Sequence, residues 1–274
     1  MDSTRKLDII GELGKLSPKE KIFEQLESKK ILENVIGFIP ACDSADVPIL
    51  VSNLGVYLGE MGYSICILDA NVFYPCIYKL FGCESKPRGR GLLSVLRSDK
   101  MDFRDEIIKT KYKNVYLMSS SFMDPIEDYL DIRQQDFEGV LLTLKDMFDL
   151  VLVSIPNNPP LESCYVSVKN CDMGFIVWSE RVDCALNTSK LMTFFSSINI
   201  GVAKFSNIII NNSMGLRFDR DIINEMKLKL IAELPFVPAA LDHSLEGNVY
   251  IAEGTIINKK FRKSLEKLAQ LIAN

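Results

Sequence analysis

Seven short apolar runs recur along the chain, and each is followed by a polar or amphipathic stretch. The runs are mostly continuous rather than alternating, which is typical of strands buried on both faces of a parallel sheet. They cover residues 34–41, 64–70, 114–119, 149–155, 173–178, 206–211 and 229–234. Because helix-like segments separate them, the pattern predicts a doubly wound α/β domain. We expect a mainly parallel sheet of seven to eight strands with helices on both faces.

The segments between the apolar runs differ from the first part of the chain. Four of them have the length and apolar spacing of helices, namely 49–61, 131–147, 183–198 and 258–273. Residues 1–32 are instead rich in Lys and Glu and have only a weak helical pattern. We therefore expect an N-terminal extension with a short helix over 1–32, followed by one α/β domain over 33–274.

Net charge and the distribution of apolar residues limit the kinds of partner and the cellular locations that we expect. The net charge of −4 at pH 7 argues against nucleic acid as the main partner. No apolar run reaches the ~20 residues that cross a bilayer. The first residues also lack the apolar core of a signal peptide. We expect a cytoplasmic protein, with a peripheral or polar position left open.

The seven cysteines form no CxxC pair and no zinc-ligand spacing. Their odd number fits poorly with a disulfide framework, and several lie in strand-like runs where cysteine acts as a small hydrophobic residue. The sequence therefore predicts reduced, structural cysteines and no metal site.

Residues 35–55 have the strand–loop–helix layout that nucleotide-binding α/β proteins use, with the helix beginning near Pro48. The loop contains neither glycine nor lysine, but it does contain Asp43 and Asp46. Glycines allow backbone N–H groups to converge on phosphates, and lysine neutralises their charge. An aspartate close to a triphosphate is repulsive. The segment thus has the layout of a phosphate-binding loop without the groups that bind phosphate.

Further motifs follow this loop in an ordered series. They are Asn53-Leu54-Gly55, Asp69-Ala70-Asn71, Pro75 with LFG at 80–82, FDLVLVSIPNNPP at 148–160, NIIINN at 207–212 and the proline-containing region 233–253. Their order and spacing resemble those of the MinD/ParA family of deviant P-loop ATPases, over about residues 33–274. The resemblance implies a P-loop NTPase fold and a site for ATP.

This chain departs from the family at the positions that carry the chemistry. Aligned without gaps, the signature lysine falls at Cys42, the phosphate-gripping lysine at Val47 and the magnesium-binding hydroxyl at Pro48. The loop glycines fall at Asp43, Ser44 and Asp46, and the aspartate of the third motif (Walker B) falls at Ser154. We therefore expect no catalytic residue and no efficient hydrolysis. Binding of ATP or ADP is expected to be weak or atypical, and no other cofactor is implied.

Two interpretations of the altered loop stay open. Asp46 can act as an N-cap, with Pro48 in the first helical turn, so that the protein itself closes the start of the helix. We favour this interpretation. Alternatively, Asp43, Ser44 and the helix N-terminus bind a different ligand, or a nucleotide in an atypical pose.

Three residues at positions matching the family's motifs are candidates for residual contacts with a nucleotide or a partner. Asp69 matches an aspartate that helps to position metal and water, or else it holds loops together by hydrogen bonds. Asn211 matches an asparagine that reads the base, or else it forms a turn after its strand. For Asn53 we favour the role of a helix residue that bonds across to neighbouring loops over that of a ligand contact.

The last predicted helix has apolar residues at 261, 265, 268 and 272 on one face and Lys or Arg elsewhere. This pattern fits a helix that packs on the sheet with a solvated basic face. It also leaves open a contact with a membrane surface through residues 259–274.

Together these features predict a catalytically inactive or strongly impaired MinD/ParA-like protein. We expect a homodimeric scaffold with protein partners, serving as a localisation or assembly factor for a bacterial surface machine such as a pilus, flagellum or secretion system. TadZ/CpaE-like pilus-localisation proteins and flagellar or polysaccharide-export relatives are the subgroups considered. The alternative is an ATPase or another nucleotide-dependent enzyme of the same fold with a rebuilt phosphate loop.

Overall fold

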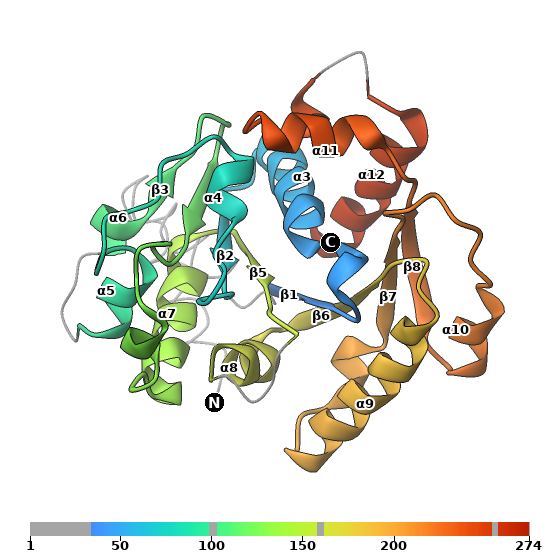
Figure 1. The fold of residues 1–274 in the computed structure, drawn as a ribbon, viewed down its shortest axis with the longest axis horizontal. Helices are drawn as coiled ribbons and strands as arrows, with labels where there is room; N and C mark the ends of the chain where they lie inside the picture. Colours follow the sequence, from blue (N-terminus) through green and yellow to red (C-terminus); the bar gives the residue numbers. More distant parts are fainter. Residues whose placement is uncertain (1–33, 99–102, 158–161, 254–256, 274) are drawn as a thin grey trace, which may run out of the picture. The chain divides into compact units, whose positions relative to one another are not determined.

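An eight-stranded sheet forms the centre of the protein, with the strand order β3-β4-β2-β5-β1-β6-β7-β8 (Figure 1). Seven strands are parallel, and they are β1 (Val35–Pro40), β2 (Ile65–Asp69), β4 (Val115–Met118), β5 (Leu150–Ser154), β6 (Met173–Trp178), β7 (Asn207–Asn211) and β8 (Lys229–Leu234). All seven predicted strands are confirmed. The eighth, β3 (Ile108–Lys109), pairs antiparallel with β4 at one edge and was not predicted.

The computed structural model describes residues 34–98, 103–157, 162–253 and 257–273. Residues 34–274 belong to one compact unit. The predicted N-terminal extension over 1–32 lies outside the described residues.

Helices cover both faces of the sheet, as predicted. The four predicted helices are confirmed as α3 (Val47–Glu60), α7 (Gln134–Met147), α9 (Asp183–Ser197) and α12 (Lys259–Ala273). In Figure 1, α3 and α12 lie above the sheet, whereas α8 (Glu162–Asn170) and α9 lie below it. Shorter helices complete the fold, and they are α4 (Ile77–Leu80), α5 (Leu92–Leu96), α6 (Phe103–Glu106), α10 (Asp221–Glu225), α11 (Pro238–Leu245), η1 (Asp43–Ala45), η2 (Ile126–Tyr129), η3 (Val202–Phe205) and η4 (Tyr250–Ala252).

The apolar face of α12 is buried within the protein. Phe261, Leu265, Leu268 and Ile272 are all buried, and the helix packs on β8 and α3. The expected packing on the sheet is therefore confirmed. Contact of residues 259–274 with a membrane surface stays a prediction, but it cannot use this apolar face, because β8 and α3 cover it. Among the described residues, no helix combines the length and apolarity needed to cross a bilayer.

The strand order places the loop after β1 at the middle of the sheet. β1 pairs with β5 on one side and with β6 on the other, and all three strands run in the same direction. The segments that follow β1, β5 and β6 therefore leave the same edge of the sheet and lie beside one another. This is the edge at which ligands of open α/β sheets usually bind.

Candidate functional site

The segment between β1 and α3 is a tight connection rather than a wide, glycine-rich loop. Residues Asp43–Ala45 form the single 3-10 turn η1, and Asp46 then adopts a left-handed backbone with φ 48° and ψ 52°. The helix α3 begins at Val47, and Pro48 lies in its first turn as predicted. Because Pro48 has no N–H, the first turn offers one amide fewer to an anion.

The prediction that the Asp46 side chain caps α3 is wrong. Asp46 occupies the N-cap position, but its side chain makes no capping hydrogen bond. A capping residue normally has an extended backbone, which aims its side chain at the amides of the next turn. The left-handed backbone of Asp46 departs from that geometry. Burial raises the pKa of this carboxyl, and the amide of Ile49 opposes that shift.

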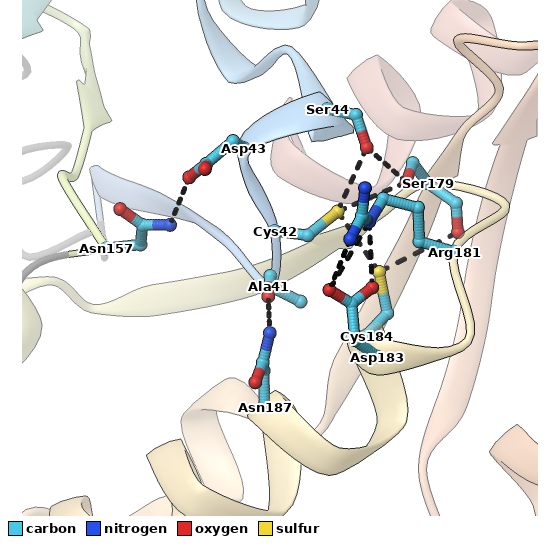
Figure 2. Close-up of polar contacts among 10 residues, drawn as sticks. All are labelled: Ala41, Cys42, Asp43, Ser44, Asn157, Ser179, Arg181, Asp183, Cys184 and Asn187. Atoms are coloured by element: carbon cyan, nitrogen blue, oxygen red, sulfur yellow. Dashed lines mark hydrogen bonds and ion pairs between the residues drawn. The ribbon is translucent and has the colours of Figure 1, made fainter.

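Asparagine side chains from other segments hold the loop in place. Asn187 of α9 donates from Nδ2 to the Ala41 carbonyl oxygen at 2.8 Å (Figure 2). Asn211, at the end of β7, donates to the carbonyl oxygen of Ala45 at 2.9 Å and more weakly to that of Asp46 at 3.3 Å. The conformation of the loop is thus set by contacts within the protein.

The contacts of Asn211 bear on its predicted role. Its amide nitrogen donates to two carbonyl oxygens of the loop after β1. The two expected roles, a turn after its strand and a contact with a base, did not include these bonds. Contact of Asn211 with a base stays a prediction.

On the other side of the loop, Asn157 donates to the Asp43 carboxylate at 3.2 Å (Figure 2).

Asp69 lies buried at the end of β2 and organises the segment that follows. Its carboxylate accepts hydrogen bonds from the amides of Cys76 at 2.9 Å, Ile77 at 3.2 Å and Asn71 at 3.3 Å. Burial raises the pKa of Asp69 to about 6, although these three amides oppose the rise. These contacts match the structural role considered for Asp69, in which it holds loops together. Ser154, the residue at the Walker B position, faces Asp69 across the β2–β5 pairing.

Asn53 joins two segments that are far apart in the sequence. Its Nδ2 donates to the Ile49 carbonyl oxygen at 2.8 Å, within α3, and its Oδ1 accepts from the Ile251 amide at 2.9 Å. The prediction that this residue bonds across to a neighbouring loop is confirmed.

Glu180, which the sequence did not single out, occupies a nest of backbone amides. It follows β6, and its carboxylate accepts hydrogen bonds from the amides of four consecutive residues after β7, 213–216, at distances from 2.7 to 3.4 Å. Burial alone would raise the pKa of Glu180, but the amides outweigh it and lower the pKa. Such nests commonly bind anions. Here the protein supplies the anion itself.

Two thiols also meet beside the loop. The Sγ atoms of Cys42 and Cys184 lie 3.2 Å apart, and Ser179 Oγ lies 3.1 Å from Cys42 Sγ (Figure 2). Hydrogen bonding to Cys184 lowers the pKa of Cys42, and burial opposes this shift. The same bond raises the pKa of Cys184. Spacing could not reveal this pair, because the two residues are 142 positions apart.

No protein-family model and no curated protein matches the sequence. Solved structures do match. MinD from Pyrococcus horikoshii OT3, complexed with Mg-ADP, has a TM-score of 0.73 at 19% identity and covers 88% of this chain and 96% of its own. This chain has the MinD/ParA fold.

Two further structures agree with this assignment. MinD in the MinC:MinD cell division protein complex of Aquifex aeolicus has a TM-score of 0.71 at 16% identity, covering 88% of this chain and 96% of that one. A ParA family ATPase from Chlorobium tepidum TLS has a TM-score of 0.72 at 14% identity, covering 87% and 98%. The predicted P-loop NTPase-like MinD/ParA fold is therefore confirmed.

Proposed function

We propose that this MinD/ParA-like chain does not hydrolyse ATP efficiently and acts as a docking scaffold, with a second copy of itself as the first partner. The docking surface is the loop edge, defined as the segments that follow the carboxyl ends of the parallel strands, up to the first turn of the next helix. The proposal rests on two properties of this edge.

The first property is the chemistry of the loop after β1. No cationic side chain lies among residues 41–48, and both Cys42 and Val47 are buried. The Asp43 side chain, in contrast, carries negative charge at the exposed surface. Two like charges 4 Å apart repel by about 1 kcal/mol in water and about 4 kcal/mol near a protein surface. A triphosphate would meet that repulsion without a lysine to offset it.

The second property carries the proposal: exposed apolar side chains concentrate at the loop edge. Eleven of the sixteen large hydrophobic residues that are exposed in the described chain lie there. They are Tyr74, Phe122, Met123, Ile126, Leu130, Val182, Leu186, Met214, Leu216, Phe236 and Leu241. Apolar side chains gathered on one side of a soluble protein are typical of a surface that binds another protein.

The assembly served by such a scaffold belongs to the same proposal. We infer a localisation or assembly factor for a bacterial surface machine such as a pilus, flagellum or secretion system, as the sequence resemblance implies. Support for protein partners in general comes from the Aquifex aeolicus structure, in which MinD of this fold is found in a complex with MinC.

Light scattering coupled to size-exclusion chromatography tests the docking surface. Wild-type protein is expected to have the mass of a dimer both with and without Mg-ATP. Leu186→Glu places a charge at the loop edge on a side chain that is 68% exposed, so it should give monomers without unfolding the chain. Leu142→Glu is the matched control, because Leu142 is a 54% exposed helix residue of α7 away from this edge. A dimer that requires Mg-ATP, or one that tolerates Leu186→Glu, contradicts the proposal.

Nucleotide binding separates the scaffold from the enzyme alternative. Equilibrium binding of a fluorescent ATP analogue, with and without Mg²⁺, is expected to show no micromolar affinity. Micromolar, magnesium-dependent binding together with phosphate release that co-elutes with the protein would establish the rebuilt ATPase instead. Phosphate release that does not co-elute is a contaminant and leaves the scaffold proposal standing.

A further inference from the structure

A group of metal-ligating side chains lies between the loop after β1 and the start of α9. Cys42 comes from the loop, and Asp183 and Cys184 open α9. Their sulfur and carboxylate oxygen atoms all lie within 4.8 Å of one another. Both cysteines are buried, at 5% and 0% exposure, while the Asp183 side chain is 37% exposed. The group therefore has an opening to solvent on its carboxylate side.

We propose that this thiol cluster, consisting of Cys42, Asp183 and Cys184, binds a thiophilic divalent cation of the Zn²⁺ class. The two sulfurs and one carboxylate oxygen would be the protein ligands. Thiolates select such cations over Mg²⁺ and Ca²⁺, which prefer oxygen ligands. The site is distinct from a nucleotide–magnesium site and does not depend on the proposed scaffold function.

The separation of the two sulfurs is close to what a tetrahedral site needs. At Zn–S bonds of about 2.3 Å, tetrahedral geometry puts two sulfurs about 3.8 Å apart. The observed 3.2 Å between Cys42 Sγ and Cys184 Sγ needs to open by only about half an ångström. Small rotations about the two side chains accomplish that. Ser179 Oγ and Ser44 Oγ, at 3.1 and 3.4 Å from Cys42 Sγ, can supply the fourth ligand or hold a water molecule there.

The charges around the cluster balance those of a divalent cation. Two thiolates and the Asp183 carboxylate carry three negative charges, and Arg181 pairs with Asp183 through Nε and Nη2 at 3.0 and 2.9 Å (Figure 2). Arginine and a divalent cation together supply three positive charges, so the loaded site is neutral. A charged group that orients a ligating carboxylate is a regular feature of metal sites. Arg181 thus acts as a positioning residue. Binding releases the thiol protons to solvent, so no oxidant or reductant is needed.

The same two sulfurs could instead form a disulfide, which requires them to approach from 3.2 Å to about 2.05 Å. A disulfide would use neither the carboxylate of Asp183 nor the hydroxyls of Ser44 and Ser179. Metal binding uses all of these groups, so it accounts for more of the arrangement. The disulfide is kept as an outcome of the test.

Cobalt titration of the reduced, metal-free protein tests the site directly. One equivalent of Co²⁺ should give near-ultraviolet sulfur-to-cobalt absorption and tetrahedral visible bands, and one equivalent of Zn²⁺ should remove both. Cys184→Ser should weaken Zn²⁺ binding about 100-fold or more, and Asp183→Asn about 10-fold. Cys83→Ser is the control, because this partly buried thiol lies outside the cluster, and it should leave the affinity unchanged.

A second measurement needs no variant and so does not depend on whether a variant folds. Zn²⁺ should protect Cys42 and Cys184 of the wild-type protein from alkylation, read residue by residue by mass spectrometry, and should leave the labelling of Cys83 unchanged. Absence of one-to-one Co²⁺ or Zn²⁺ binding under reducing conditions overturns the proposal. So does affinity retained in the Cys42→Ser/Cys184→Ser double variant. A loss of 2 Da on mild peroxide treatment, without metal binding by the reduced protein, would assign a redox pair in place of the metal site.

Discussion

Asn211 offers a sharp test of whether the loop after β1 is held by the protein or shaped for a nucleotide. If Asn211 chiefly anchors the loop, Asn211→Ala should destabilise the fold and loosen residues 41–50. If it chiefly reads a base, the same change should leave stability almost intact and affect only nucleotide binding. The two roles therefore predict different results for one substitution.

The structure sets the size of the expected effect. Asn211 is 8% exposed, and the Ala45 carbonyl oxygen that it serves at 2.9 Å belongs to a residue with no exposure. A buried carbonyl left without its donor costs about 1–3 kcal/mol. The longer bond to the Asp46 carbonyl and the lost side-chain volume add to this cost. We expect a loss of about 2–3 kcal/mol, which lowers the Tm of a domain this size by about 5–10 °C.

Urea unfolding and hydrogen exchange measure the two parts of this prediction. Asn211→Ala should lower the free energy of unfolding and speed amide exchange across residues 41–50. Asn212→Ala is the matched control, because Asn212 donates to the Leu234 carbonyl at 2.7 Å rather than to the loop. It should lower stability without affecting exchange in residues 41–50. An Asn211→Ala protein within about 0.5 kcal/mol of wild type, with unchanged exchange, would refute the anchoring role.

Three further predictions follow from other buried groups. The pKa of Asp69 in the folded chain, about 6, lies above the ordinary value of 3.8, so its stabilising contribution is complete below pH 4 and declines as the pH rises through 6. Unfolding free energy should therefore fall by about 3 kcal/mol over that range, and Asp69→Asn should remove this slope in a pH series of urea titrations. Glu180→Gln should speed amide exchange at residues 213–216 and cost about 1–3 kcal/mol, because a neutral amide satisfies fewer of the four N–H groups; unchanged exchange would show that the carboxylate is dispensable. Gly174→Ala should cost about 1–3 kcal/mol in calorimetry, because an added Cβ would lie 2.4 Å from the ring of buried Phe205; a wild-type Tm would contradict that packing.

Local patterns in the sequence were sufficient for the seven parallel strands and the four longest helices of this fold. Continuous apolar runs located all seven parallel strands, because strands buried on both faces need apolar residues on both. Helical spacing located α3, α7, α9 and α12. The antiparallel strand β3 was missed, since two residues at a sheet edge are too short to produce a pattern. The absence of lysine and glycine from the phosphate loop could also be recognised from the sequence, because it depends only on which residues occupy those positions.

The tertiary structure decided which side chains contact the loop after β1. Asp46 stands where a capping residue is expected, but it has a left-handed backbone and its side chain makes no capping hydrogen bond. The loop is instead anchored by Asn187 and Asn211, 146 and 166 positions from their acceptors. The Cys42–Cys184 pair likewise comes from segments 142 positions apart. These groups meet because β1 lies beside β6, and β6 beside β7, in the sheet, an order that local periodicity does not contain. Sequence determined which chemistry the loop lost, and the packing of distant segments determined what replaced it.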